Sequence, residues 1–203
     1  MTDTQKTRER LVNEMARLAI KKGFNRTSIN DVVQAVGIKK GTLYYYFPSK
    51  DKLGLAVLER DRDDFLSFIE TNLSGEDPQK SLERFFNAVL KKHKDTGFVG
   101  GCLWGNTALE MSDTNSVYKK VVEDVFAEWI ARIEAVILSG QQTGQIRADQ
   151  SATELAHLVV AGIEGGIMMS RITKKDYPFK SCLDSIRILL KYENIHKTTN
   201  NHS

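Results

Sequence analysis

The chain has 203 residues, of which 41% are hydrophobic and 27% charged, with a net charge of +3, the composition of an ordinary soluble protein with one or two domains. Its two cysteines exclude a disulfide framework and a cysteine metal site, and we expect buried thiols in a reducing cytosol. The polar start has no apolar signal core, and no uncharged apolar run reaches the ~20 residues of a membrane helix, so we expect a cytoplasmic protein without a membrane partner.

The charges are unevenly distributed along the chain. Residues 1–52 carry eleven Lys and Arg against five Asp and Glu, whereas residues 53–203 carry eighteen against twenty-one. A basic head on a slightly acidic body is typical of a module that docks on phosphates. A solvated lysine face is the alternative, and charge alone does not decide between the two.

Two helices are predicted first in the chain. One runs from about residue 4 to 22 and ends at Gly23. The next begins after Thr27 or Ser28, either of which could accept a hydrogen bond from the first-turn amides as the N-cap. It buries an apolar stripe and ends at Gly37, where a glycine suits a left-handed turn.

A third, short helix follows from about residue 39 to Phe47, ended by Pro48. Only Leu43 and Phe47 would face inward, and Ser49 can cap the helix after it. The remaining side chains of the short helix are basic, small or aromatic and face outward. Such a helix is better suited to lying in a DNA groove than to filling a core. A basic helical hairpin without a DNA role is the alternative.

The rest of the chain also reads as helical, with no strand-rich segment. A fourth helix, about residues 49–72, links the head to the body, and the loop SGEDP marks a boundary. We therefore expect an all-α fold of about nine helices, with a disordered polar tail at residues 196–203. The further helices are expected at about residues 78–94, 102–111, 113 or 114–139, 151–172 and 179–193.

The motif GFNRTSINDVVQAVGIKKGTLYYYFPSKDKL, within residues from about 5 to 65, resembles the DNA-binding domain of the TetR family of bacterial transcriptional regulators. The resemblance implies an N-terminal three-helix helix-turn-helix domain at residues 1–50 and a C-terminal helical domain for effector binding and dimerisation at residues 51–195. It implies phosphate contacts, base reading or backbone contacts by Thr27, Ser28, Lys39, Lys40, Gly41, Thr42, Tyr44, Tyr45, Tyr46 and Lys50. Tyr46 stands where related sequences often have histidine, which leaves the sequence preference open.

A second motif, GGCLWGNTALEMSD, resembles the regulatory domain of a TetR subgroup that responds to drugs and small hydrophobic molecules. Aromatic and methionine side chains with a few polar groups are typical of cavities for apolar ligands. Simple packing of the body is the alternative for each of them. The candidate effector-binding residues are Phe98, Trp104, Glu110, Met111, Trp129, His157, Glu164 and Met168.

The glycines of GIEGG in the eighth helix reduce helix propensity, by about 1 kcal/mol per residue, and therefore predict a close approach of helices. In the TetR family the last two long helices pair with their copies, so we expect a homodimer. The apolar residues expected at that interface are Leu155, Leu158, Val159, Ile186, Leu189 and Leu190.

Enzyme chemistry has no support in the sequence. The four histidines are scattered, and neither a nucleophile elbow nor a phosphate-binding glycine loop occurs, so we expect no catalytic residue, metal or cofactor. The sequence predicts a DNA-binding transcriptional regulator, a homodimeric repressor released from a palindromic operator on double-stranded DNA by a small hydrophobic or amphipathic effector. The alternative is an architectural or division-related DNA-binding protein without an effector. Neither the effector, the operator nor the sign of regulation follows from the sequence.

Overall fold

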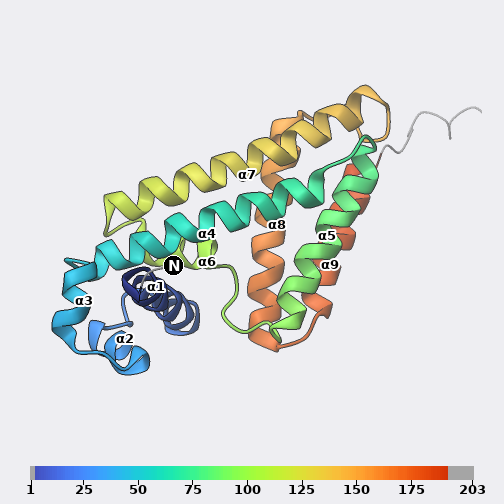
Figure 1. Cartoon of the computed structure of the whole chain (residues 1–203). Coiled ribbons are helices and arrows are strands. Elements are labelled where there is room, and N and C mark those ends of the chain that lie inside the picture. The colour runs from blue at the N-terminus through green and yellow to red at the C-terminus, as the bar shows by residue number, and fades with distance from the viewer. Residues whose placement is uncertain (1–2, 192–203) are drawn as a thin grey trace, which may run out of the picture. The chain divides into compact units, whose positions relative to one another are not determined.

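The computed structural model describes residues 3–191, which form nine helices and no strand (Figure 1). The predicted all-α class is therefore confirmed, whereas the predicted tail at 196–203 lies outside the described residues. The helices are α1 (Asp3–Lys22), α2 (Ile29–Val36), α3 (Lys40–Tyr46), α4 (Lys50–Leu73), α5 (Pro78–Asp95), α6 (Leu103–Met111), α7 (Ser116–Gln142), α8 (Ala152–Thr173) and α9 (Tyr177–Leu190).

Helix α7 begins later than predicted. Its start was expected at Asp113 or Thr114, but the first helical residue is Ser116. The side chain of Asn115 accounts for this, since its Oδ1 accepts the backbone N–H groups of Val117 at 3.1 Å and Tyr118 at 3.2 Å. These bonds satisfy first-turn amides that have no partner inside the helix, so Asn115 acts as the cap.

The chain folds into two compact units. The first comprises residues up to Phe68 together with Thr96–Ala127, and the second comprises Ile69–Asp95 together with the chain from Glu128 onward. The head helices α1–α3 therefore share a unit with α6 and the first part of α7. The division at residue 50 into DNA-binding and effector domains stays a prediction about function.

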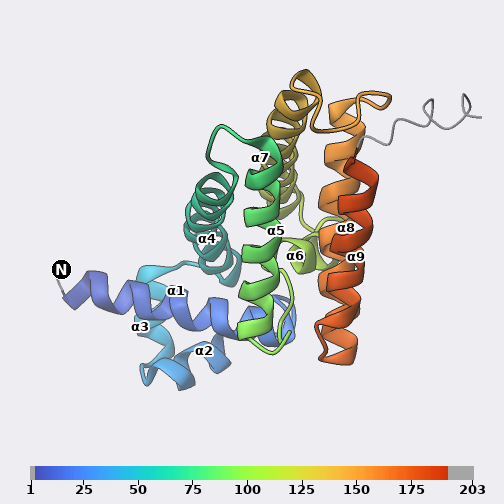
Figure 2. The same cartoon turned by 90° about the vertical axis from the view of Figure 1, so that its right-hand side faces the viewer.

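The core of the first unit joins the head helices to the start of α4, to α6 and to α7. Helix α1 packs on α2 and α6, and α2 packs on α3 (Figure 2). Phe24 meets Tyr118 edge-on at 5.5 Å between ring centres, which ties the α1–α2 loop to α7. The fully buried residues of this core include Leu11, Met15, Val32, Leu43, Leu53, Val57, Leu58 and Val125.

In the second unit α8 and α9 run side by side, and glycines let them approach closely (Figure 2). A Cβ atom on Gly166 would lie 2.5 Å from Cδ2 of Phe179, and one on Gly162 would lie 2.8 Å from Cδ1 of Ile186. The predicted close approach at the GIEGG segment is thus confirmed, and α9 of the same chain is the helix that approaches.

Among the described residues, α8 alone is long and apolar enough to cross a membrane by length and composition, with a mean hydropathy of 1.3. This is weak evidence, because the core helix of a soluble protein passes the same test. Nine of the 22 residues of α8, between Ala152 and Ser170, are buried.

Candidate nucleic-acid interface

The start of α2 is fixed by a reciprocal cap between Ser28 and Asp31. The Asp31 N–H donates to Oγ of Ser28 at 3.1 Å, and the Ser28 N–H donates to Oδ2 of Asp31 at 2.7 Å. Of the two residues that could cap this helix, Ser28 therefore does so. The Lys22 ammonium, 2.7 Å away, and then the N–H and hydroxyl of Ser28 lower the pKa of Asp31 to about 2.

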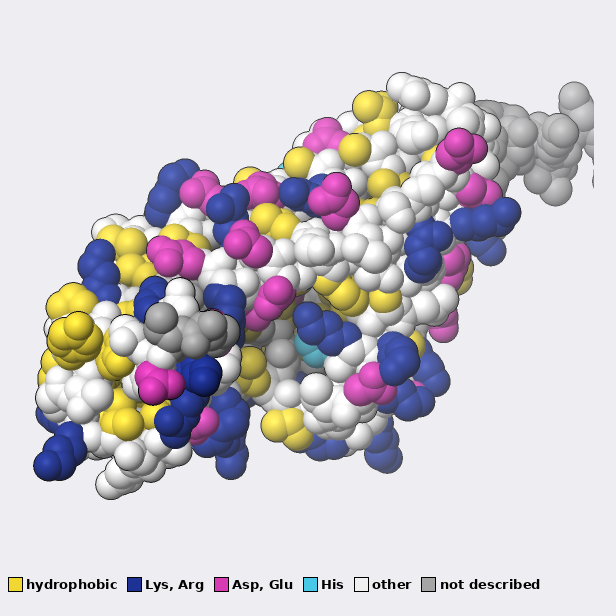
Figure 3. Space-filling view, viewed as in Figure 1, with side chains coloured by type: hydrophobic (Ala, Val, Ile, Leu, Met, Phe, Trp, Pro, Cys, Tyr) yellow, Lys and Arg dark blue, Asp and Glu magenta, His cyan; other side chains and the backbone are white. Residues whose placement is uncertain are grey.

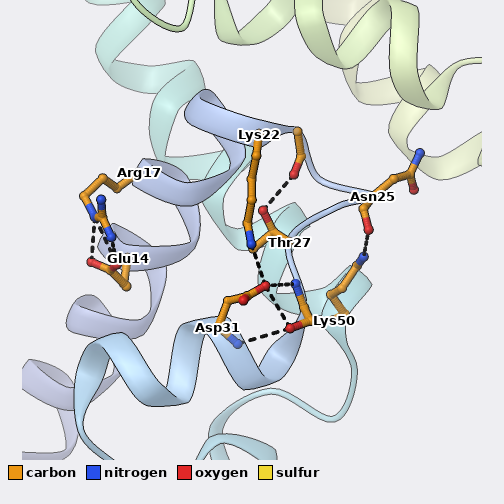
Figure 4. Close-up of polar contacts among 9 residues, drawn as sticks. Glu14, Arg17, Lys22, Asn25, Thr27, Asp31 and Lys50 are labelled. Atoms are coloured by element: carbon orange, nitrogen blue, oxygen red, sulfur yellow. Dashed lines mark hydrogen bonds and ion pairs between the residues drawn. The ribbon is translucent and has the colours of Figure 1, made fainter.

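Thr27 has a structural role instead of the expected phosphate contact. Its side chain is fully buried, and its hydroxyl donates to the carbonyl of Gly23 at 2.7 Å (Figure 4). A buried hydroxyl already engaged with the backbone cannot reach a DNA phosphate without unfolding the loop. We therefore leave Thr27 out of the proposed contacts and keep Ser28, which is exposed.

The turn between α2 and α3 has the geometry of a helix-turn-helix. Gly37 adopts a left-handed φ of 76°, and its N–H donates to the carbonyl of Val33 at 2.9 Å. Nη2 of Arg10 donates to the carbonyl of Val36 at 2.7 Å, which satisfies one of the last carbonyls of α2. Arg10 was not predicted, because its partner lies 26 residues away in the chain.

Helix α3 has few inward anchors, as the sequence predicted. Leu43 is fully buried within it and Phe47, its C-cap, is also buried. Lys39, the N-cap, and the residues Lys40, Gly41 and Thr42 are all exposed, and a Cβ on Gly41 would meet nothing within 4 Å. The first turn of α3 therefore presents an open backbone beside two ammonium groups and a hydroxyl.

The three tyrosines of α3 are not equivalent. Tyr45 is 80% exposed and Tyr44 43% exposed, whereas Tyr46 is half-buried and packs against the core. Tyr46 meets Tyr45 edge-on at 5.2 Å between ring centres. Figure 3 shows hydrophobic side chains in yellow beside basic ones in dark blue over α3.

Lys50 lies at the start of α4 and contacts the α1–α2 loop. Its Nζ donates to the carbonyl of Asn25 at 3.1 Å (Figure 4). Oγ of Ser49 accepts the Lys52 N–H at 3.2 Å, which confirms the predicted cap of α4. The first-turn amides of α4 and the two lysines form a basic helix start.

Two further basic residues of α1 hold the head together. The Arg8 guanidinium lies 5.0 Å from the centre of the Phe47 ring, and Lys22 pairs with Asp31. Both contacts join residues far apart in the sequence, so no local pattern predicts them. They place positive groups of α1 against α2 and the end of α3, and they leave fewer free cations on α1 than the charge count suggests.

Comparison with known proteins decides the family. A model described as bacterial regulatory proteins, tetR family, matches residues 11–57, and one described as tetracyclin repressor-like, C-terminal domain, matches residues 78–186. The chain belongs to the TetR family. TetR regulators bind DNA operators, so this chain is a DNA-binding transcriptional regulator and the expectation of no enzyme activity agrees with its family.

Similar proteins span nearly the whole chain. The HTH-type transcriptional repressor DhaR of Mycobacterium sp. (strain GP1) is 28% identical over 192 residues, 93% of this chain and 95% of that protein. A TetR transcriptional regulator from Chloroflexus aurantiacus is 30% identical, with a TM-score of 0.82, covering 93% of this chain and 96% of that one. The regulatory protein TetR from Rhodobacter sphaeroides shares the fold, at 24% identity and a TM-score of 0.83, over 90% of this chain and 97% of that one.

The eight residues predicted to bind an effector fall into both units of this TetR-family protein. Phe98, Trp104 and Met111 are buried in the first unit, and Trp129 is buried in the second. The indole N–H of Trp104 has no hydrogen-bond acceptor among the described residues. A buried donor of this kind costs about 1–3 kcal/mol unless a partner binds it.

Three of the predicted effector residues are either exposed or already hydrogen-bonded to the backbone. The Glu110 carboxylate accepts hydrogen bonds from the backbone of Phe24 and Asn25, so it is already engaged. His157 is exposed, with Nδ1 2.8 Å from the carbonyl of Thr153, and Met168 is exposed on α8. We leave these three out of the proposed effector site. Glu164 is half-buried on α8 and stays a candidate.

A small pocket in the second unit lies apart from the predicted effector residues. The space open to water-sized groups is about 30 Å³, enough for about two waters, so it is too small for an organic effector. Arg187 at its edge is paired with Glu83 at 2.8 Å and Asp184 at 2.8 Å. Its walls are Gln79, Leu82, Glu83, Phe86, Gln145, Ile146, Arg187, Leu190 and Lys191.

The six residues predicted at the dimer interface divide into buried and exposed sets. Leu155, Val159, Ile186 and Leu190 are buried within the chain's own second unit, so their packing is intramolecular. Leu158 is 43% exposed and Leu189 41% exposed. Other large apolar side chains exposed on α8 and α9 are Met168, Met169, Ile172, Tyr177 and Ile188.

Proposed function

We propose that this TetR-family regulator is a cytoplasmic homodimeric repressor that leaves a palindromic operator when a small apolar effector binds. The observation that carries the proposal is the exposed face of α3. This helix has one fully buried side chain, and it exposes a lysine, a threonine and two tyrosines, with a second exposed lysine at its N-cap. A core helix would bury more of its surface, whereas a groove-reading helix needs this chemistry on the outside.

The contacts to DNA would fall into two groups, those to base edges and those to phosphates. Lys39, Lys40 and Thr42 offer donors to base edges, and Gly41 lets the backbone come close to them because it faces open space. Other exposed or half-buried groups are suited to phosphates, which fix position and carry little sequence information. The proposed phosphate contacts are Ser28, Tyr44, Tyr45, Tyr46 and Lys50.

A two-fold dimer supplies the second reading head. Two half-sites one helical turn apart, about 34 Å, would each receive one α3. The exposed apolar side chains of α8 and α9 support an interface of this kind, because such surface is normally covered in a soluble protein.

The buried indole N–H of Trp104 supports an effector with an oxygen acceptor. Phe98 and Met111 are buried in the same unit and are the candidates for the apolar surroundings that such a molecule needs. A ligand that binds the released state more tightly than the DNA-bound state shifts the equilibrium away from the operator.

A thermal-shift screen with apolar compounds that carry a carbonyl or hydroxyl oxygen tests the effector. A compound that binds only the folded protein raises its melting temperature, and the proposed effector also releases a labelled operator fragment. Trp104→Phe removes the N–H and keeps an aromatic ring, so it should weaken both responses about fivefold to tenfold. An operator that stays bound with every compound that raises the melting temperature argues for a regulator without an effector.

A further inference from the structure

The Glu110 carboxylate at the end of α6 binds the backbone of the α1–α2 loop through two hydrogen bonds. Its Oε2 accepts the Phe24 N–H at 2.8 Å, and its Oε1 accepts the Asn25 N–H at 2.7 Å. Gly23, at a φ of 88°, makes room for it, since a Cβ there would lie 2.6 Å from Oε1 of Glu110. A carboxylate with two donors is a charge-assisted pair, stronger than a neutral hydrogen bond.

The same loop also accepts a hydrogen bond from Lys50. The carbonyl of Asn25 accepts from Nζ of Lys50 at 3.1 Å, while the N–H of Asn25 donates to Glu110 (Figure 4 shows the Lys50 bond). One residue, Asn25, therefore links the carboxylate of α6 to the ammonium at the start of α4. An ammonium group has three donors, so the bond to Asn25 leaves two for a DNA phosphate.

We propose that Glu110 is a positioning residue for DNA binding, which sets the place of the Lys50 ammonium through the backbone of Asn25. The proposal rests on the proposed function, in which Lys50 contacts a phosphate. An ammonium on a flexible four-carbon chain loses rotamer entropy when it binds, and a fixed carbonyl beside it reduces that loss. Glu110 touches no DNA itself and acts through the loop.

Neighbouring contacts of the first unit keep α6 and α7 at this loop. Nδ2 of Asn106 donates to the carbonyl of Gly100 at 2.6 Å, and Gly100 packs directly on Ile20 of α1. The Tyr118 hydroxyl donates to the carbonyl of Asp51 at 3.3 Å, next to Lys50. The carboxylate of Glu110 is thus held in a packed contact between α6 and the head.

An effector bound at Trp104, as proposed above, would act on the head through this link. Helix α6 carries Trp104 and Met111, both candidate effector residues. Glu110, which is bonded to the α1–α2 loop, lies in the last turn of this helix. Hydrogen bonds at 2.7–2.8 Å are lost beyond about 3.5 Å, so a displacement of the end of α6 by about 1 Å breaks them. Release of the loop would free Lys50 and weaken the phosphate contact.

Titrations of the full-length protein with a duplex that it selects from random double-stranded DNA, over a range of salt concentrations, test the proposal. Glu110→Gln removes one of the two acceptor positions, and Glu110→Asp keeps the charge but is one methylene too short to hold both amides. The matched control is Glu123→Gln, which removes the same charge from an exposed position on α7 of the same unit. Melting temperatures identify variants that fail to fold.

Both Glu110 variants should bind the operator roughly threefold to tenfold more weakly. The magnitude of the slope of log K against log salt should decrease by about 2 per dimer, one phosphate contact per protomer. Loss of an acid by itself would tighten DNA binding slightly, which is the result expected for Glu123→Gln. In a Lys50→Ala background the Glu110 variants should weaken binding no further, because the ammonium that Glu110 positions is gone.

The proposal is overturned by wild-type affinity and salt slope in both Glu110 variants, or by effects that persist in full beside Lys50→Ala. If Glu110→Gln is destabilised, Glu110→Asp provides the test. Hydrogen exchange at the Phe24 and Asn25 amides shows whether their hydrogen bonds to residue 110 are broken. If the wild-type protein ignores operator DNA, the proposed function fails as well. If it binds and the variants match it, only the role of Glu110 fails.

Discussion

Tyr45 and Lys50 differ in how much the fold depends on them. Tyr45 makes an edge contact with Tyr46 and is otherwise open to solvent, so its ring contributes little to packing. Lys50 is half-buried and bonded to the α1–α2 loop. Both side chains keep hydrogen-bond donors available for phosphate. Because Tyr45 is less packed than Lys50, its removal should affect folding less.

Tyr45→Ala and Lys50→Ala should each weaken binding to all operator sequences alike. Each loses a phosphate contact in both protomers, so the magnitude of the salt slope should fall by about 2 for Lys50→Ala. Tyr45→Ala should keep the wild-type melting temperature. Lys119→Ala, at an exposed position on α7, is the control, and equal losses at Lys119 and Lys50 would show a general charge effect.

His93 gives the second unit a dependence on pH. Burial, and secondly the charge of Lys92, lower the pKa of His93 to about 4, and its ring meets Phe179 of α9 edge-on at 6.3 Å. The unfolded chain, with an ordinary histidine pKa near 6.5, takes up the proton first as the pH falls. The contribution of His93 to the free energy of unfolding is therefore fully present above about pH 6.5. It is lost as the pH falls toward 4.

Replacement of His93 by Gln should flatten this decline. The wild-type protein should lose up to about 3 kcal/mol of unfolding free energy between pH 6.5 and 4 through this group, and urea unfolding at several pH values measures it. Gln cannot take up the proton, so the variant starts less stable and changes less. His157→Gln, at an exposed histidine of α8, should keep the wild-type decline, and a flat wild-type profile would contradict the assignment.

Residue roles were predicted well where they depend on neighbours in the chain. Ser28, Gly37 and Ser49 take the cap and turn positions that local chemistry favours. Glu110 was placed in an effector site from its helix alone, yet its partners Phe24 and Asn25 lie 86 and 85 residues away. Pairings at that distance depend on the tertiary fold, which periodicity and capping rules do not contain.

At the scale of elements, helix identity followed from apolar spacing and from glycine and proline stops. All nine helices of the described chain were expected near their observed bounds. Burial of whole faces was harder to predict. Leu155 and Val159 were expected in a dimer interface, but the same stripe of α8 packs on its own unit, since an apolar stripe does not specify which neighbour covers it.

The contact between α8 and α9 predicts opposite effects for two adjacent glycines. Gly166→Ala places a methyl group 2.5 Å from the Phe179 ring and should destabilise the protein by about 1–3 kcal/mol. Gly165→Ala meets nothing within 4 Å and removes a helix-weakening glycine, so it should be neutral or stabilising by up to about 1 kcal/mol. Chemical denaturation compares them, and equal effects would contradict this packing.

At the scale of the whole molecule, the proposed reading of a palindromic operator needs a second copy of the chain. One α3 is a short element with few contacts, and a two-fold pair doubles them over two half-sites. The chain's own exposed surface on α8 and α9 gives the candidate interface, with Leu158 and Leu189 from the predicted set.

Leu158→Glu should therefore weaken both self-association and operator binding. A buried, unpaired carboxylate at a two-fold contact occurs twice, so a loss of at least a hundredfold in dimer affinity is expected, on the order of 3 kcal/mol. Sedimentation velocity measures it. Leu109→Glu, at an exposed leucine of α6, is the control, and an unchanged dimer for Leu158→Glu would place the interface elsewhere.

Selection of binding sites from random double-stranded DNA by the full-length protein tests the central claim, that α3 reads bases in two copies. The account predicts a palindromic motif with half-sites about 10 base pairs apart, and a changed motif for Gly41→Ala or Thr42→Ala with the fold intact. No enriched motif, or one that both variants leave unaltered, would contradict it.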